Sequence, residues 1–565
     1  MTQEVHNGLL ISDFNLQNLA GLLNNDPLGP PVKVKNAPYG QVMQLLSNPG
    51  HELWQEKYSF LLVWTSPESL VPLFNRALNY EQVNPNDLLD QVDEYCNLLL
   101  RIADKAGSIL VPTWTLPSWH RGWGLLDWKS GAGTGYLLAR MNARLAENLH
   151  DQNGFYIPDA NRWLTSAGDA AYNPKMYYMA KIPFNNPVFQ AAASDIKSAL
   201  RTIKGQGKKM IVLDLDDTLW GGIVGDLGWE NIRLGGHDAI GEAFVDFQRH
   251  LKALTNRGII LGIVSKNEES IALEAISRHP EMVLRPDDFA GWRINWNDKA
   301  QNIVDLVQEV NLGLQSIVFI DDNPVERSRV REALPEVLVP EWPADKMLYT
   351  RTLVQMDCFD TAVVSREDAD RSRMYVSERK RKALQTDLGS VRDWLMTLDM
   401  KVHVSPLTPV DLPRTAQLLN KTNQMNLTTR RMTESELQEW ANAANHRLWV
   451  FRVEDKFGDS GLTGIMSMEW DDRQARIVDF ILSCRVMGRQ VEETMLHIAV
   501  KHAQETGAGR LLAEYLPTPK NKPCLQFFQS SGMSQDGTRY TWDTRNDLPC
   551  PAHIHLIKES GKEHD

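Results

Sequence analysis

The chain has 565 residues, which is too long for a single hydrophobic core and predicts about three domains. Hydrophobic residues make up 42% of it and charged residues 23%, so large-scale disorder is excluded. The net charge of −12 disfavours nucleic acid as a partner, and an acidic partner would need a local basic patch.

The composition also bears on the compartment. No apolar run approaches the roughly 20 residues that span a bilayer. The first residues, MTQEVHNGLLISDF, have neither the basic nor the apolar segment of a secretory signal. The five cysteines are scattered without metal-ligand spacing, which suits a reducing compartment. We therefore expect a cytoplasmic protein without a membrane or nucleic-acid partner.

In chain order, the first unit is an α/β domain that we place at residues 1–200. Apolar runs predict strands at 58–64 and 108–112, and helical spacing of apolar residues predicts helices at 87–105 and 136–148. A Gly/Lys-rich linker at 204–209 follows.

The second unit, at residues 205–350, alternates strands and helices. Its expected elements are a strand at 211–213, a helix at 240–255, a strand at 258–264, helices at 268–277 and 299–310, and a strand at 316–320. This alternation predicts a doubly wound parallel sheet.

The rest of the chain divides into a connector at 351–397 and an α+β domain at 398–565. The connector contains a charged helix at 365–384, capped by Ser365. The last domain is expected to contain helices at 412–419, 434–444 and 491–506 and strands at 448–453, 462–470, 475–482 and 510–515.

Carboxylates follow two of the predicted parallel strands. Asp214 and Asp216 come directly after the strand at 211–213, and Asp321 and Asp322 come after the strand at 316–320. The carboxyl ends of parallel strands meet at one edge of the sheet, where ligands bind. Carboxylate oxygens suit Mg²⁺, so we expect a magnesium site with metal ligands drawn from Asp214, Asp216, Asp321 and Asp322. The choice between Asp321 and Asp322 stays open.

Three further residues predict phosphoryl chemistry at this edge: Thr218, Ser265 and Lys299 are placed to hydrogen-bond a phosphoryl group and balance its charge. Asp214 is the expected nucleophile, with Asp216 as general acid and then base. The ordered set resembles the haloacid-dehalogenase (HAD) phosphotransferases, whose first motif is D-x-D-x-T.

The C-terminal domain carries a second signal. A strand ending near Cys484 is followed by a turn with Arg485, Gly488 and Gln490 and then by a helix. This unit resembles the acyl-CoA signature of GNAT acyltransferases, although their consensus has Gly or Ala where Gln490 stands. Helix N-termini bind phosphate groups, so Arg485, Gly488 and Arg489 are expected to hold a pantetheine arm. Cys484 is a candidate acyl-carrying nucleophile, and the alternative is a small buried side chain.

Together these motifs resemble the FkbH-like family, HAD-type glyceryltransferase/phosphatases of polyketide biosynthesis. The resemblance rests on DLDDTLWGGIVGD (214–226), IVSKN (263–267), INWNDKAQNI (294–303), FIDDNPVER (319–327), LLNKTNQMNLTTRR (418–431) and FILSCRVMGR (480–489). It implies a HAD-like doubly wound sheet between an SGNH-hydrolase-like N-terminal domain and a GNAT-like C-terminal domain. The first is degenerate, with ISDFN at 11–15 but no Asp-x-x-His partner. Asp217 stands where many relatives carry Asn.

The resemblance implies a reaction. The glyceryl group of D-1,3-bisphosphoglycerate would lose its phosphates and pass, through a thioester on Cys484, to the phosphopantetheine thiol of an acyl carrier protein. Asn423, Gln424 and Arg430 are expected to contact the substrate, with ordinary helix caps as the alternative.

Other functions remain open at this point. The first alternative is a Mg²⁺-dependent HAD phosphatase with a non-catalytic GNAT-like scaffold. The others are an N-acyltransferase that uses acyl-CoA and a non-catalytic module that docks carrier proteins.

Overall fold

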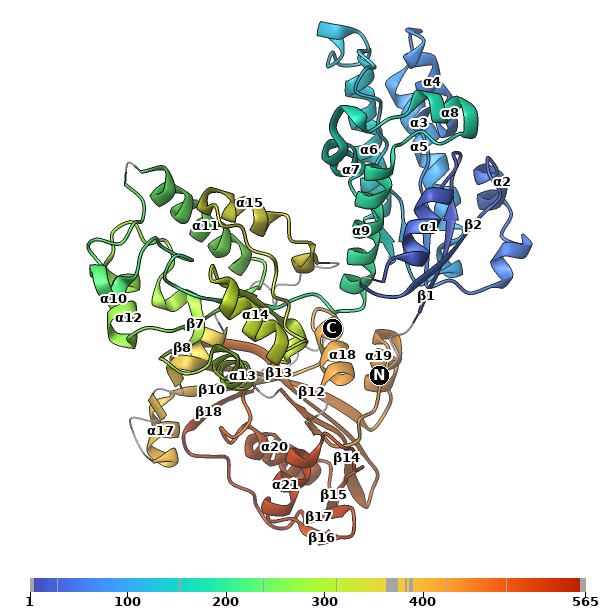
Figure 1. Cartoon of the computed structure of the whole chain (residues 1–565). Coiled ribbons are helices and arrows are strands. Elements are labelled where there is room, and N and C mark those ends of the chain that lie inside the picture. Colours follow the sequence, from blue (N-terminus) through green and yellow to red (C-terminus); the bar gives the residue numbers. More distant parts are fainter. Residues whose placement is uncertain are drawn as a thin grey trace. The chain divides into compact units, whose positions relative to one another are not determined.

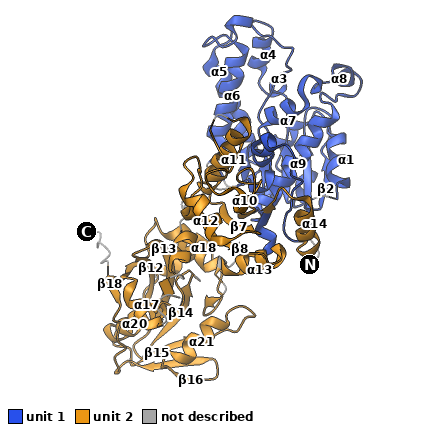
Figure 2. Cartoon of the chain, turned by 60° about the vertical axis from the view of Figure 1, so that its left-hand side comes forward, with its two compact units in different colours: residues 1–209, 314–318, 336–365 blue, residues 210–313, 319–335, 366–565 orange. Residues whose placement is uncertain are grey.

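The computed structural model describes residues 5–27, 29–150, 152, 154–236, 238–310, 312–361, 374–381, 384–385, 390–422, 424–483 and 485–558. The chain forms two compact units (Figure 2). The first comprises Met1–Lys209, Leu314–Val318 and Glu336–Ser365, and the second comprises Met210–Gly313, Phe319–Pro335 and Arg366–Asp565.

The first unit is built on a parallel sheet in the order β2-β1-β3-β4-β5 (Figure 1). Its strands are β1 (His6–Ile11), β2 (Val32–Asn36), β3 (Phe60–Val63), β4 (Ile109–Leu110) and β5 (Phe155–Tyr156). Its helices are α1 (Gln17–Asn25), α2 (Val42–Ser47), α3 (Pro67–Leu70), α4 (Pro72–Leu78), α5 (Pro85–Leu100), α6 (Thr134–Leu149), α7 (Ala160–Ala167), α8 (Pro174–Ala180), α9 (Asn186–Ile203) and α15 (Tyr349–Val354). The strands and helices expected around 58–64, 108–112, 87–105 and 136–148 are present, whereas α9 was not predicted.

Both faces of this sheet are covered, which explains why its inner strand β3 is apolar at every position. Leu61 and Val63 of β3 belong to one hydrophobic core, and Leu62 belongs to the core on the opposite face. Successive side chains of a strand point to opposite faces, so a sheet covered on both sides needs apolar residues at every position.

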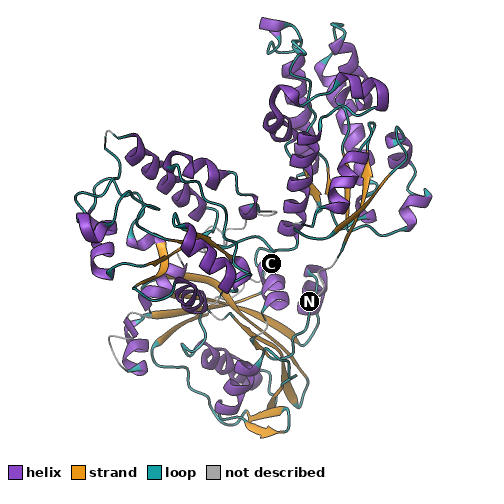
Figure 3. Cartoon of the chain, in the orientation of Figure 1, coloured by secondary structure: helices purple, strands orange, loops and turns teal. Residues whose placement is uncertain are grey.

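The second unit begins with the doubly wound sheet that the sequence predicts, in the order β8-β7-β6-β9. The strands are β6 (Met210–Leu213), β7 (Ile260–Ser265), β8 (Phe289–Ile294) and β9 (Ile317–Ile320), and the first two residues of β9 are counted with the first unit. The helices are α10 (Val224–Leu227), α11 (Ala239–Thr255), α12 (Glu269–Arg278), α13 (Lys299–Glu309) and α14 (Pro324–Ala333). The sequence analysis missed β8 and α14. Figure 3 distinguishes the helices from the strands.

The C-terminal part contains a mixed sheet in the order β16-β17-β15-β14-β13-β12-β10-β18, with β11 also paired to β14. Its strands are β10 (Met400–Pro406), β11 (Met425–Asn426), β12 (His446–Asp455), β13 (Gly458–Trp470), β14 (Gln474–Leu482), β15 (Arg510–Glu514), β16 (Ser534–Asp536), β17 (Arg539–Asp543) and β18 (Ile554–Lys558). Its helices are α17 (Val391–Thr397), α18 (Leu412–Lys421), α19 (Glu434–Ala441), α20 (Val491–Glu505) and α21 (Lys522–Ser530). The predicted fold class, α/β with two parallel sheets and a mixed C-terminal sheet, is confirmed.

Two strands of the mixed sheet separate along their length. β14 and β15 pair in parallel over Gln474–Ile477 and Arg510–Ala513. β14 then continues to Leu482, where Ile481 and Leu482 pair with β11 instead. The end of β14 therefore leaves β15 just before the turn that leads into α20.

Of the expected connector helix, the structure describes residues 374–381 as helical, while its expected start at Ser365 lies outside the described residues. Across the described part of the chain, no helix has both the length and the apolar character to cross a bilayer.

Candidate functional site

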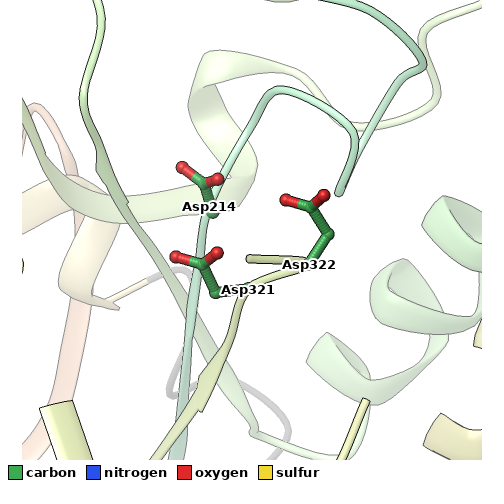
Figure 4. Close-up of side chains that lie close together, drawn as sticks. All are labelled: Asp214, Asp321 and Asp322. Carbon is green, nitrogen blue, oxygen red and sulfur yellow. The ribbon is translucent and has the colours of Figure 1, made fainter. Parts of the chain in front are cut away.

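Three aspartates meet at the carboxyl edge of the second unit's parallel sheet. Asp214 follows β6, and Asp321 and Asp322 follow β9, because the apolar residues of both strands fill the core and the acidic residues begin where that core ends. One carboxylate oxygen from each of the three lies within 4.8 Å of the others. Asp214 and Asp321 are buried and Asp322 is half-buried. Figure 4 shows the three side chains on the same side of the strand ends.

Lys299 lies between two of these aspartates. Its ammonium group is 3.0 Å from Asp214 Oδ1 and 2.6 Å from Asp321 Oδ2. Burial alone would lower the pKa of Lys299, but the charges of Asp214 and Asp321 raise it above its usual value. Lys299 therefore stays charged at the start of α13, as its expected role of balancing phosphoryl charge requires.

The same proximity changes the titration of Asp321. Burial and the charge of Asp214 raise the pKa of Asp321 to about 6, although Lys299 opposes this shift. Two buried carboxylates facing one lysine leave an excess of negative charge, which a divalent cation would relieve. The donor set, carboxylate oxygens alone, fits Mg²⁺.

Asp216 is held in one orientation by three donors. Its Oδ1 accepts hydrogen bonds from Trp220 Nε1 (2.9 Å) and Val224 N (3.1 Å), and its Oδ2 accepts one from Asn267 Nδ2 (2.9 Å). Burial, with the charges of Asp214 and Asp217, raises the pKa of Asp216. A carboxyl group that is oriented and easily protonated fits the expected general acid. Asn267 belongs to the IVSKN segment (263–267), in which it is an alternative to Ser265 as the polar residue of the site.

The other expected phosphate contacts lie beside this cluster. Ser265 ends β7 and is buried. Thr218 is also buried, and its Oγ1 accepts a hydrogen bond from Asp322 N (3.2 Å), so it supports the β9 turn. Arg327, missed in the sequence, donates from Nη1 to the carbonyls of Asp321 (2.9 Å) and Asp322 (2.7 Å).

The turn before α20 differs from a preformed phosphate site. Gly488 N donates a hydrogen bond to Glu492 Oε1 (2.9 Å). This N–H group, which was expected to bind a pantetheine phosphate, is therefore already bonded to a carboxylate of the same chain. Glu492 is buried, and among the residues that the structure describes its Oε2 has no hydrogen-bond partner. Burial together with the charge of Glu493 raises the pKa of Glu492 to about 7. Gln490 adopts a left-handed conformation (φ 63°) at the N-cap.

Both arginines of this turn have internal partners. Arg489 is buried between Glu378 Oε2 (2.5 Å) and Asp455 Oδ2 (3.4 Å). Arg485 Nη1 lies 3.0 Å from Met374 Sδ. Glu378 and Met374 belong to the helical residues 374–381, so these arginines attach that segment to the C-terminal domain.

The residues expected to contact the glyceryl group are only partly described. Arg430 pairs with the buried Asp479 of β14 and lies over the Trp440 ring at 4.7 Å. Asp479 also accepts a hydrogen bond from Ser467 Oγ (2.5 Å). Gln424 is exposed. Asn423 and the candidate nucleophile Cys484 lie outside the described residues.

The chain is similar to several solved structures. It is 31% identical to the N-terminal part of the protein BF1531 from Bacteroides fragilis, whose crystal structure contains a phosphatase domain complexed with Mg. The match covers 64% of this chain and 96% of that chain, with a TM-score of 0.57. The chain belongs to the family of BF1531. In this BF1531 family member, the Asp214–Asp321–Asp322 cluster is the group of described residues suited to a metal ion.

Other similarities are limited to a smaller part of the chain. The Vibrio cholerae spermidine N-acetyltransferase in complex with CoA and spermine is 16% identical, with 26% of this chain and 96% of that chain covered and a TM-score of 0.21. The ribosomal-protein-S18-alanine N-acetyltransferase of Escherichia coli is 9% identical over 29% of this chain and 99% of that chain, with a TM-score of 0.21. No acyl-transfer activity follows from these values. No protein-family model and no curated protein matches the sequence.

Proposed function

We propose that this chain is a FkbH-like glyceryltransferase/phosphatase. It takes the glyceryl group of D-1,3-bisphosphoglycerate, removes both phosphates, and loads glyceryl onto the phosphopantetheine thiol of an acyl carrier protein. The phosphatase activity in this proposal rests on the cluster of Asp214, Asp321 and Asp322, two of which contact Lys299. It also rests on the similarity to BF1531, whose phosphatase domain was crystallised with Mg.

In this proposal Asp214, Asp321 and Asp322 hold Mg²⁺. When bound, the ion supplies positive charge that offsets the repulsion between a phosphoryl group and a carboxylate nucleophile. Asp214 attacks phosphorus, and the bond from phosphorus to the glyceryl oxygen breaks as Asp216 gives its proton to that oxygen. Asp216 then takes a proton from water, which attacks the aspartyl-phosphate and releases inorganic phosphate. Lys299 balances charge throughout.

The acyl phosphate needs a different reaction. The thiolate of Cys484 attacks the carbonyl carbon, and the acyl phosphate bond breaks to release phosphate and leave a thioester. The carrier's thiolate then attacks this thioester and frees Cys484. The support for this assignment is the resemblance of the FILSCRVMGR segment (480–489) to the FkbH-like family, in which Cys484 follows the end of β14.

A second candidate is a Mg²⁺-dependent phosphatase whose C-terminal domain is a scaffold. It is favoured by the internal partners of Gly488 and Arg489, which occupy two of the groups expected to bind pantetheine.

Intact-protein mass spectrometry separates the two candidates. Incubation with D-1,3-bisphosphoglycerate and Mg²⁺ is expected to add a glyceryl or phosphoglyceryl mass to the wild-type protein. The adduct should be absent in Cys484→Ala and present in Cys358→Ala, a matched change at a cysteine in the other unit. An adduct that persists in Cys484→Ala would overturn the thioester, and a wild-type protein that releases phosphate without any adduct would favour the scaffold.

A further inference from the structure

The first unit carries an unusually apolar exposed loop between β4 and α6. Five large hydrophobic side chains of residues 119–129 are exposed: Trp119 (53%), Trp123 (40%), Leu125 (104%), Leu126 (53%) and Trp128 (73%). Single exposed apolar residues are common, but a contiguous group of this size marks an interaction surface. We call residues 119–129 the tryptophan platform.

The platform is held rigidly by one carboxylate. Asp127 Oδ1 accepts hydrogen bonds from the amides of Trp123 (3.2 Å) and Thr134 (2.9 Å), and its Oδ2 accepts one from Gly135 (3.0 Å). Thr134 Oγ1 donates to the same carboxylate. These bonds connect the loop to the first turn of α6. Trp119 and Trp123 also pack edge-on against Tyr172 and Tyr80.

Two glycines make this arrangement possible. Gly122 has a φ of 48°, and a Cβ there would lie 1.9 Å from Asp127 Oδ1. A Cβ on Gly133 would lie 1.9 Å from the Asp127 carbonyl oxygen. The loop is therefore a defined structure, and a rigid surface binds a partner with a smaller loss of conformational entropy than a flexible one.

The charges beside the apolar group have one sign. Arg121 and Lys129 are exposed, and neither forms an ion pair with any residue that the structure describes. The acid within the loop, Asp127, is enclosed by its four donors. On a chain of net charge −12, this is a local basic surface with tryptophans at its centre. Trp and Arg are the residue types enriched among the energetically dominant contacts of protein interfaces.

We propose that the tryptophan platform is the docking surface for an acidic protein domain with apolar side chains between its acids, namely the acyl carrier protein. The choice of this acidic partner rests on the proposed function. Arg121 and Lys129 steer the acidic surface toward the loop, and Leu125 and Trp128 supply the buried contact. Two copies of this chain, each of net charge −12, repel one another at long range, which disfavours self-association through the platform.

Direct binding tests this proposal without any turnover. The probe is a holo acyl carrier protein of fatty-acid synthesis, labelled with a fluorophore, titrated with the full-length chain. We expect the double variant Leu125→Ser/Trp128→Ala to raise the Kd at least tenfold, and Lys129→Glu to raise it at least fivefold at low salt. The controls Val354→Ser and Lys57→Glu, which change an exposed aliphatic and an exposed cation elsewhere in the same unit, should stay within twofold.

Other occupants of the surface are outcomes of the same experiment. Circular dichroism checks that each variant is folded. A carrier that fails to bind the wild type, or that binds every folded variant within twofold, would overturn the proposal. So would platform-dependent binding to phosphatidylcholine vesicles, or platform-dependent dimerisation in sedimentation, with unchanged carrier binding. Phosphate release by the wild type, measured without a carrier, tests the proposed function separately.

Discussion

At the scale of single residues, the cluster of Asp214, Asp321 and Asp322 contains charges that offset one another. Lys299 contacts Asp214 and Asp321, while Asp216 points its oxygens at Trp220, Val224 and Asn267. The two aspartates of the D-x-D pattern therefore have different surroundings. Asp214 is paired with the cation of Lys299, which balances the charge of the expected nucleophile. The other is oriented by neutral donors and has a raised pKa, as a proton donor requires.

The nucleophile can be tested with a neighbouring aspartate as control. Asp214→Asn removes the attacking oxygen and a metal ligand, so phosphate release should fall by about 1000-fold or more. Asp217→Asn should change it by less than about threefold, because Asp217 has a φ of 54° that Asn adopts readily, and its contact to Gly222 N needs only an oxygen. Steady-state phosphate release measures both. Equal losses in the two variants would argue against Asp214 as the nucleophile.

The raised pKa of Asp321, about 6, predicts a pH dependence of metal binding. A proton on this carboxyl group must leave before the metal can bind. Affinity for Mg²⁺ should therefore be constant above about pH 7 and fall below pH 6, approaching about tenfold per pH unit. Calorimetric titration at pH 5, 6 and 7.5 measures this. An affinity that stays constant from pH 7.5 to 5 would contradict the assignment.

At the scale of elements, the polar groups of the turn before α20 bind other groups of the same chain. The turn has the spacing of a phosphate-binding loop, but Glu492 from the first turn of the helix bonds back to Gly488. Arg489 points to Glu378 and Asp455 and so connects the helical residues 374–381 to β12. A pantetheine phosphate would have to displace the Glu492 carboxylate from the Gly488 amide, or bind elsewhere on the turn.

Glu492 also predicts a stability change with a defined sign. Its pKa in the folded protein is about 7, against 4.5 for an ordinary glutamate. Between these values the folded chain binds more protons than the unfolded chain, so the free energy of unfolding falls as pH rises from about 4.5 to 7. Glu492→Gln removes this loss and should stabilise the protein at pH 8 by about 1–3 kcal/mol, with almost no gain at pH 4.5.

Urea unfolding at the two pH values measures the effect. Glu439→Gln, at an exposed position of α19 in the same domain, is the matched control. If the Glu492→Gln difference is the same at pH 4.5 and pH 8, the carboxyl group does not titrate as stated.

At the scale of the whole molecule, the chain passes repeatedly between its two units, because Leu314–Val318 and Glu336–Ser365 belong to the first unit and the residues between them to the second. Asp214 precedes both of these first-unit segments in the sequence, and Asp321 and Asp322 lie between them. Metal binding should therefore stabilise a large part of the chain against unfolding.

Calorimetry of the full chain tests this effect of the metal. At a Mg²⁺ concentration about 100 times its Kd, binding adds about 2.7 kcal/mol to the folded state. This should raise the main unfolding midpoint by on the order of 5 °C, and EDTA should reverse the shift. Asp321→Asn should remove the shift. A midpoint that rises equally in this variant would place the metal elsewhere.

The local sequence was enough to predict that Asp214, Asp321 and Asp322 would meet, and to predict three of the four strands of their sheet, with β8 missed. Acids directly after apolar strands are a local pattern, and the order of Asp214, Ser265, Lys299 and Asp321 along a doubly wound sheet leaves one edge where they can meet. Only the tertiary structure decided which side chains pair. In the folded chain Lys299 lies between two aspartates. Arg489 forms ion pairs with Glu378 and Asp455, and Arg430 forms one with Asp479. A buried cation needs a partner because burying an unpaired charge is costly. That partner is supplied by a residue far away in the chain, so the local sequence does not indicate which residue it is.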